Sequence, residues 1–184
     1  MPNHRLISIT KYFFSAIALV SLSLFTGCNS VNLDSTVPTL NSRYHDQDPA
    51  LSGDGKLVAF VSNRDGPKRI YVYSIERQSL INLPGLNFGE AIAESPSLSY
   101  TGRYIIYISS IQGRPDLILY DRATGKSELL TRGYRNWIRN PHISPDGRYI
   151  VFETSRRGQW DLEVLDRGPF VELDLPDGIP IPSS

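Results

Sequence analysis

The feature that most limits how this chain can fold is an internal repeat that occurs three times. When the copies are aligned on Gly55, Gly102 and Gly147, these glycines stand 47 and 45 residues apart. Around each glycine the same residue types fall into register: proline six residues before it, serine three before it, a basic residue directly after it and a second glycine eleven after it. Such a unit is one supersecondary element, and neighbouring units stack to bury their apolar faces.

Each unit contains segments that are typical of β-strands. Between its two glycines lie LVAFVS, YIIYIS and YIVFET, which are rich in β-branched and aromatic residues. Their almost unbroken apolar runs indicate strands that are buried on both faces. A further strand follows in IYVYS, LILYD and LEVLD, and another is predicted near SLINL, SELLT and FVEL.

The turns complete the prediction for each unit. The glycines are expected to take positive φ in turns between antiparallel strands. Each proline is expected in a short first strand or at its start, where a missing N–H is tolerated. Every unit is therefore predicted to be a four-stranded antiparallel meander, and units of this kind at this spacing are typical of β-propeller blades. The predicted fold class is all-β, with three four-stranded antiparallel β-propeller blades.

The third unit resembles the WD-like propeller repeat of the periplasmic TolB family. SPDGRYIVFETSRRG followed by DLEVLD matches the order of that repeat, and SNRDG in the first unit matches its second signature. The resemblance spans residues 44–175. The TolB family carries a six-bladed propeller after an α/β domain, so the three units here correspond to a partial propeller, half of such a ring. The resemblance implies a role in envelope integrity or biopolymer transport, with peptidoglycan-linked lipoproteins as the family's partners.

The first 27 residues have the order of an export signal. They hold no acidic residue, carry Arg5 and Lys11, and continue through the apolar stretch YFFSAIALVSLSLF to TGC. That stretch is shorter than the roughly 20 residues that a membrane-spanning helix needs. The ending TGC resembles the lipobox of bacterial lipoproteins, with Phe25 where that family usually has an aliphatic residue. Cys28 is therefore the predicted lipid attachment site, and a plain secretory signal is the alternative.

A lipid on Cys28 would anchor the protein to a membrane of the bacterial cell envelope, facing the periplasm. Asn29 follows the cysteine, where Asp marks inner-membrane retention in some enteric bacteria, and this favours the outer membrane. The predicted organisation begins with a lipoprotein signal peptide (residues 1–27) and a lipidated tether (28–43). Three blades follow, at residues 44–84, 85–131 and 132–175, and the chain closes with a C-terminal tail (176–184).

Charge and motifs argue against nucleic-acid binding and catalysis. The 19 basic residues are balanced by 19 acidic ones, whereas nucleic-acid binders carry a basic surface. No G-x-S-x-G, H-E-x-x-H or P-loop motif occurs, and we expect no hydrolase domain of the prolyl oligopeptidase kind to follow the repeats. His45, Asp46 and Asp48 are better explained as a loop entering the first strand than as metal ligands. We expect a protein that is not an enzyme and that has no cofactor or metal.

The segment TRGYRNWIRN, residues 131–140, is the candidate protein-binding surface. It interleaves basic and aromatic residues of the types enriched at interface hot spots: Arg132, Tyr134, Arg135, Trp137 and Arg139. The alternative is a plain connection in which Trp137 packs between blades and the arginines face water. The expected function is a scaffold for envelope proteins; binding of a small ligand or glycan, or a hydrolase-associated role, are the alternatives.

Closure of the propeller is a separate question, because rings typically have four to eight blades. Two copies of the chain would supply six blades, so a homodimer is the predicted assembly. The alternatives are an open monomer capped by residues 174–184 and pairing with a different propeller-bearing chain.

Overall fold

The computed structural model describes residues 39–87, 89–110 and 113–176. The predicted signal peptide and Cys28 lie outside these residues. Among the described residues, no helix is long and apolar enough to cross a bilayer.

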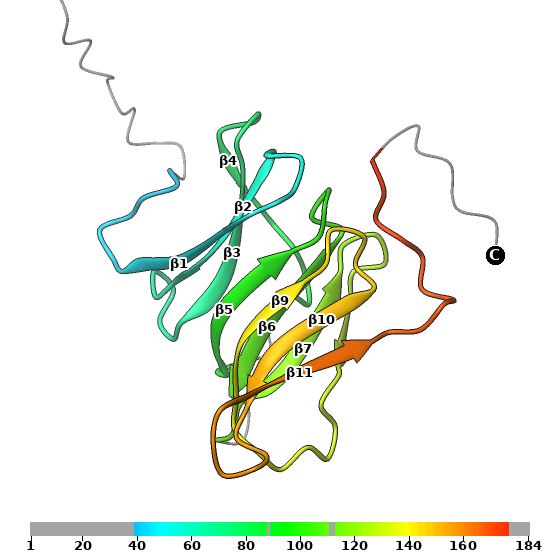
Figure 1. Ribbon diagram of the computed structural model, residues 1–184. Coiled ribbons are helices and arrows are strands. Elements are labelled where there is room, and N and C mark those ends of the chain that lie inside the picture. The colour runs from blue at the N-terminus through cyan, green and yellow to red at the C-terminus, as the bar shows by residue number, and fades with distance from the viewer. Residues whose placement is uncertain (1–38, 88, 111–112, 177–184) are drawn as a thin grey trace, which may run out of the picture. The chain divides into compact units, whose positions relative to one another are not determined.

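Three antiparallel sheets follow one another along the chain (Figure 1). The first, blade 1, consists of β1 (Asp46–Leu51), β2 (Leu57–Ser62), β3 (Arg69–Ser74) and β4 (Ser79–Ile81). Blade 2 consists of β5 (Ile92–Leu98), β6 (Tyr104–Ser110), β7 (Asp116–Asp121) and β8 (Lys126–Leu129). Blade 3 consists of β9 (Ile138–Ile143), β10 (Tyr149–Thr154) and β11 (Asp161–Asp166). The predicted all-β class and antiparallel blades are confirmed.

The recurrent serine and glycine build the turn between the first two strands of each blade. In blade 1 the hydroxyl of Ser52 accepts a hydrogen bond from the N–H of Leu57 (2.9 Å), and the N–H of Gly55 donates to the carbonyl of Ser52 (2.9 Å). The same bonds occur in the other two blades. Gly55, Gly102 and Gly147 have φ of 71°, 69° and 80°. The predicted positive φ is confirmed, and it explains why glycine recurs there.

The recurrent prolines lie at β-bulges in the first strands. Pairing shifts register around Pro49, Pro96 and Pro141, and the residue before each has φ between 50° and 53°. A bulge leaves one residue of the strand unpaired, so the missing proline N–H costs no ladder bond. The expected position in the first strand is confirmed, while the bulge itself was not predicted.

Two apolar clusters hold the blades together. The first joins blade 1 to blade 2, with Val72 and Tyr107 among its members, and the second joins blade 2 to blade 3, with Leu119 and Phe152. Strand β6 is therefore buried on both faces. The same expectation is wrong for β10, whose burial alternates, because no other blade among the described residues covers the outer face of blade 3.

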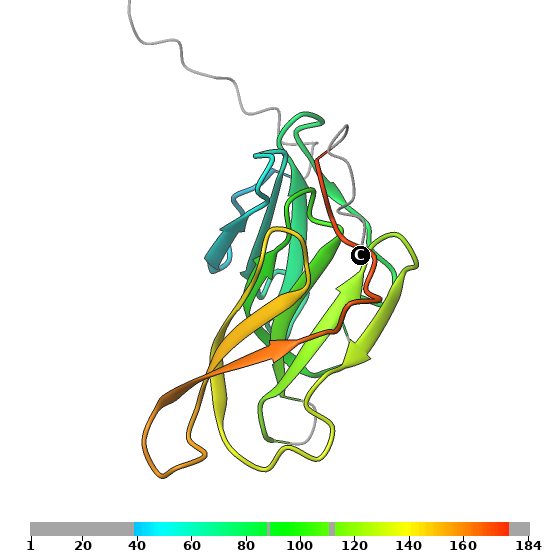
Figure 2. The same ribbon diagram turned by 45° about the vertical axis from the view of Figure 1, so that its right-hand side comes forward.

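The fourth strand predicted for blade 3 at residues 170–173 does not form. After β11 the chain continues as an irregular segment (Figures 1 and 2). Gly168 has φ 95°, and Pro169 has no N–H to donate to a ladder. Instead of turning back along β11, this segment binds the turn between β5 and β6.

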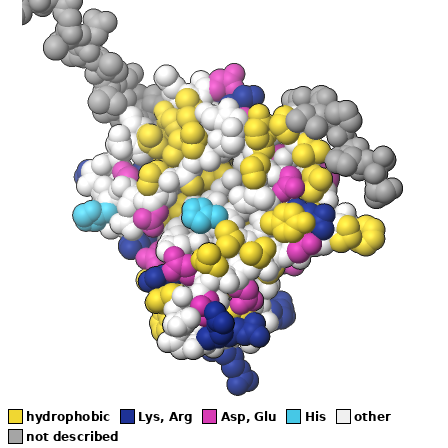
Figure 3. All heavy atoms as spheres, in the orientation of Figure 1, with side chains coloured by type: hydrophobic (Ala, Val, Ile, Leu, Met, Phe, Trp, Pro, Cys, Tyr) yellow, Lys and Arg dark blue, Asp and Glu magenta, His cyan; other side chains and the backbone are white. Residues whose placement is uncertain are grey.

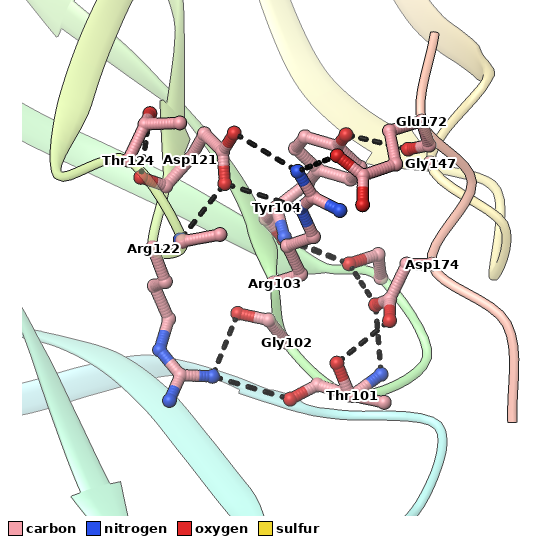
Figure 4. Close-up of polar contacts among 12 residues, drawn as sticks. Thr101, Gly102, Arg103, Tyr104, Asp121, Arg122, Thr124, Gly147, Glu172 and Asp174 are labelled. Carbon is pink, nitrogen blue, oxygen red and sulfur yellow. Dashed lines mark hydrogen bonds and ion pairs between the residues drawn. The ribbon is translucent and has the colours of Figure 1, made fainter. Parts of the chain in front are cut away.

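Asp174 makes the main contact of that C-terminal segment (Figure 4). Its side chain is buried, and its carboxylate accepts hydrogen bonds from the Ser99 hydroxyl (2.6 Å), the Thr101 N–H (2.8 Å) and the Thr101 hydroxyl (2.6 Å). Nearby, Arg103 donates to Glu172 (2.7 Å), and the Tyr104 hydroxyl donates to the carbonyl of Glu172. The C-terminal segment thereby ties the end of blade 3 to blade 2.

Candidate interaction surface

The segment before β9 lies beside the turn between β10 and β11, which brings two basic stretches of the sequence together at one end of blade 3. The N–H of Trp137 donates to the hydroxyl of Ser155 (3.0 Å), and the N–H of Ser155 donates to the carbonyl of Trp137 (3.0 Å). These reciprocal bonds hold the backbone of Trp137 in place. Its side chain remains 59% exposed, so it does not pack between blades.

Tyr134 has a different role from the other predicted residues. Its ring packs edge-to-face on the buried Phe152, with ring centroids 6.1 Å apart. Its hydroxyl donates to Glu163 (2.7 Å) and shares a hydrogen bond with Thr154 (2.6 Å). Burial raises the pKa of this phenol. Tyr134 therefore anchors the segment to blade 3, leaving its neighbours to face outward.

Arg139 lies between a carboxylate and an indole. Its guanidinium donates to Glu153 (2.6 Å) and stands 3.9 Å from the ring centroid of Trp160, within the range of a cation–π interaction. Hydrogen bonds from Asn140 and Arg139 hold the pKa of Glu153 below its usual value. Trp160 is 45% exposed. Sequence reasoning missed it, although the basic-aromatic run SRRGQW was a visible signal.

Two further arginines come from the β10–β11 turn. Arg157 forms a bidentate pair with Asp161 (2.7 Å for both hydrogen bonds), and this pair, with a hydrogen bond from Gln159, lowers the pKa of Asp161 to about 2. Arg156 lies 3.9 Å from Glu163. By contrast, Arg132 and Arg135 are exposed, and no carboxylate among the described residues pairs with either.

We call this basic-aromatic surface the blade 3 tip and define it by Arg132, Arg135, Trp137, Arg139, Arg156, Arg157 and Trp160. Figure 3 shows Lys and Arg side chains gathered at the lower end of the molecule as drawn, where Figure 1 places the β10–β11 turn and the segment before β9. Of the five residues predicted for protein binding, Arg132, Arg135, Trp137 and Arg139 are exposed on this surface, and Tyr134 supports it.

The other candidate cluster is the segment entering blade 1. Asp46 pairs with Arg64 (2.8 Å) and accepts from the N–H and hydroxyl of Ser42. Burial alone would raise the pKa of Asp46, but hydrogen bonds from Ser62, Arg64 and Ser42 outweigh it and lower the pKa to about 2. Within the described ranges, no three His, Cys, Asp or Glu side chains converge as a metal site. Asp46 is thus part of an ion pair that secures residues 39–42.

Stacked antiparallel meanders with apolar clusters between them define a β-propeller-type protein. A family model described as the TolB beta propeller domain matches residues 31–177, so the chain belongs to this family. The Protein TolB homolog of Chlorobaculum tepidum is 32% identical over 71 residues, which are 39% of this chain and 16% of that protein. The chain thus spans only a small part of the length of this curated relative.

Solved structures show the same fold. TolB from Acinetobacter baumannii superposes with a TM-score of 0.60 at 24% identity, over 70% of this chain and 31% of that one. The tricorn protease superposes with a TM-score of 0.51 at 17% identity, over 70% of this chain and 12% of that one. At these identities the likeness is one of fold alone, and one propeller fold serves many functions.

Proposed function

We propose that this chain is a non-enzymatic protein-binding scaffold of the bacterial cell envelope, anchored by a lipid on Cys28 and facing the periplasm, with the outer membrane favoured by Asn29. Membership of the TolB propeller family supports a place among envelope proteins that serve envelope integrity or biopolymer transport. The partner's contact region is an acidic segment of an envelope protein, bound at the blade 3 tip.

The observation that carries this proposal is that Trp137 has an exposed side chain on a fixed backbone. A large apolar side chain that is 59% exposed, on a backbone held by two reciprocal hydrogen bonds to Ser155, is preorganised for contact. Rigid aromatic and arginine side chains lose little conformational entropy on binding, which is why they dominate interface energetics. Arg132 and Arg135 flank it without carboxylate partners in the described part of the chain. An acidic segment would supply those partners.

Photo-cross-linking in living cells tests the proposal. A photoreactive amino acid in place of Trp137 is expected to give a discrete protein adduct, and the same group at Ile75 provides the control. Ile75 is 44% exposed but lies in the turn between β3 and β4, away from the tip. Arg132→Glu with Arg135→Glu should reduce the adduct at least tenfold at an unchanged melting temperature, because the new carboxylates repel an acidic partner.

The adduct is then identified by mass spectrometry, and a synthetic peptide of its cross-linked segment is titrated against the wild-type and Arg132→Glu, Arg135→Glu proteins. Equal adducts at positions 137 and 75, or an adduct that survives the charge reversal, would show that the tip is not the binding surface.

A further inference from the structure

The outer face of blade 3 is a sheet face without a described neighbour, and its surface is apolar. Leu162 is 76% exposed, Val164 65% and Tyr149 43%, with Val151 half-buried among them. Val151 pairs directly with Val164 across β10 and β11. Blade 3 stands in front in Figure 1, and Figure 3 shows hydrophobic side chains on that face among charged ones.

The repeat shows what kind of surface this is. Leu162 holds the position of Ile70 in blade 1 and Leu117 in blade 2, which are 1% and 0% exposed. The other positions agree: Val164 corresponds to Val72 (1%) and Leu119 (3%), and Tyr149 to Leu57 (7%) and Tyr104 (2%). In blades 1 and 2 these side chains are covered by the next blade. The exposed face therefore has the composition of a blade-to-blade interface.

Two positions depart from this pattern. His142, which pairs with Val151 across β9 and β10, is exposed where Ala50 is half-buried and Ser97 is buried. Glu153 stands where Val61 and Ile108 are buried, and it is paired with Arg139 of the blade 3 tip. A polar pair at the rim of an apolar interface is the usual arrangement.

The complementary surface is the opposite face of a blade, and blade 1 has one that no other blade covers. In blade 2 that face presents Ile105 and Tyr107 to blade 1, and blade 1 carries Val58 and Phe60 at the same positions. Leu51, also on this face through its pairing with Val58, is 58% exposed. A hollow lined by Leu40, Pro49, Val58 and Phe60 opens there.

Residues 39–42 and Arg64, whose guanidinium stands over the ring of Phe60, cover part of this face. A segment that corresponds to residues 39–42 lies within both described interfaces. In blade 2 the Tyr107 hydroxyl donates to the carbonyl of Leu86, and in blade 3 Tyr134 packs on Phe152. Tyr107 and Phe152 hold the repeat position of Phe60, which lies beside Leu40. Leu40 is thus the counterpart of linker residues that are compatible with a preceding blade.

We propose that two copies of this chain associate head to tail, with the outer face of blade 3 of each copy packing on the free face of blade 1 of the other. The contact joins different surfaces, so it must either close into a ring or grow into an open filament. Propellers typically close with four to eight blades; two copies supply six and three would supply nine. This contact borders the blade 3 tip at Arg139 but does not involve Arg132, Arg135 or Trp137, so it can be tested separately from the proposed function.

Engineered cysteines test the contact. In blades 1 and 2, Leu57 and Leu98 lie in the same cluster, each beside Gly102. Their counterparts across the proposed interface are Tyr149 and Leu51. In a Cys28→Ser background, which removes the only native thiol, the full chain is prepared as Tyr149→Cys and, separately, as Leu51→Cys. Mixing the two variants under mild oxidation should give a disulfide-linked dimer, which neither gives alone.

Sedimentation velocity on the Cys28→Ser chain should show a dimer at micromolar concentration. Leu162→Asp should abolish both the dimer and the mixed disulfide at an unchanged melting temperature of the dilute protein, whereas Ile75→Asp, also at an exposed apolar residue, should leave both intact. A monomer throughout, or a disulfide-linked dimer from the Tyr149→Cys variant alone, would overturn the proposal. So would a ladder of larger species from a chain that carries both Tyr149→Cys and Leu51→Cys, or a disulfide between Tyr149→Cys and a different protein.

Discussion

At the scale of single residues, the same repeat position has different surroundings in different blades. Gly55 and Gly147 both have positive φ, at 71° and 80°. A Cβ on Gly55 would meet no atom within 4 Å, whereas one on Gly147 would lie 2.8 Å from Cε2 of Tyr104 and closer still to Cδ2. Tyr104 is 2% exposed and is held by its hydrogen bond to Glu172. It cannot move aside freely.

We therefore expect Gly55→Ala and Gly147→Ala to differ in cost. Gly55→Ala should lower the free energy of unfolding by about 1 kcal/mol, since only the left-handed backbone conformation is strained. Gly147→Ala should lower it by about 2 to 4 kcal/mol, because overpacking against Tyr104 adds to that strain. Urea denaturation followed by tryptophan fluorescence measures both values. Equal costs would mean that Tyr104 does not pack against Gly147.

At the scale of elements, the turn between β5 and β6 is completed by a carboxylate from a distant part of the chain. In blades 1 and 3 an aspartate two residues after the recurrent serine, Asp54 or Asp146, accepts its hydroxyl hydrogen bond. Blade 2 has Thr101 at that position, and Asp174 supplies the carboxylate in its place. The hydrogen bond that is local in the turns of blades 1 and 3 is therefore, in blade 2, a long-range contact with the C-terminal segment.

This exchange predicts a specific rescue. Asp174→Ala should lower the free energy of unfolding by about 2 to 3 kcal/mol, because it removes the carboxylate that accepts hydrogen bonds from the Ser99 hydroxyl and from the N–H and hydroxyl of Thr101. Thr101→Asp should restore part of that loss in the Asp174→Ala background. The same substitution should destabilise the wild type, where two carboxylates would face each other. A double-mutant cycle measures the coupling, and additive effects would contradict the assignment.

At the scale of the whole molecule, two apolar clusters tie the three blades into one body. In our proposal, attachment of this body to the envelope depends on the acylation of Cys28. Acyl chains contribute about 0.8 kcal/mol per buried CH₂, so stable anchoring requires more than one chain.

The substitution Cys28→Ser is expected to move the protein from the membrane pellet to the soluble periplasmic fraction on cell fractionation. The substitution Asn29→Ser provides the control, since it keeps the cysteine and should leave the protein in the pellet. If the Cys28→Ser protein stayed in the pellet as fully as the wild type, the anchoring proposal would be wrong.

Much of the fold could be predicted because its signals are local. The positive φ of Gly102, the bulge-compatible Pro96 and the β-branched run of β6 each express a requirement of the backbone at their own position. Their recurrence shows that one unit is built three times. Exposure of Trp137 could be anticipated only as one of two alternatives, because a residue that packs between blades and an interface residue share the same local pattern.

What the sequence by itself determined is therefore the repeated antiparallel meander, since strand propensity, turn chemistry and spacing act within each unit. Only the tertiary structure decided which side chains have neighbours. It packed the half-buried Tyr134 on Phe152, left Leu162 exposed where Leu117 is covered, and placed Asp174 where blade 2 lacks an aspartate. The physical reason is that burial and hydrogen bonding across blades depend on segments distant in the chain, and identical repeat positions cannot signal which of them meets a partner.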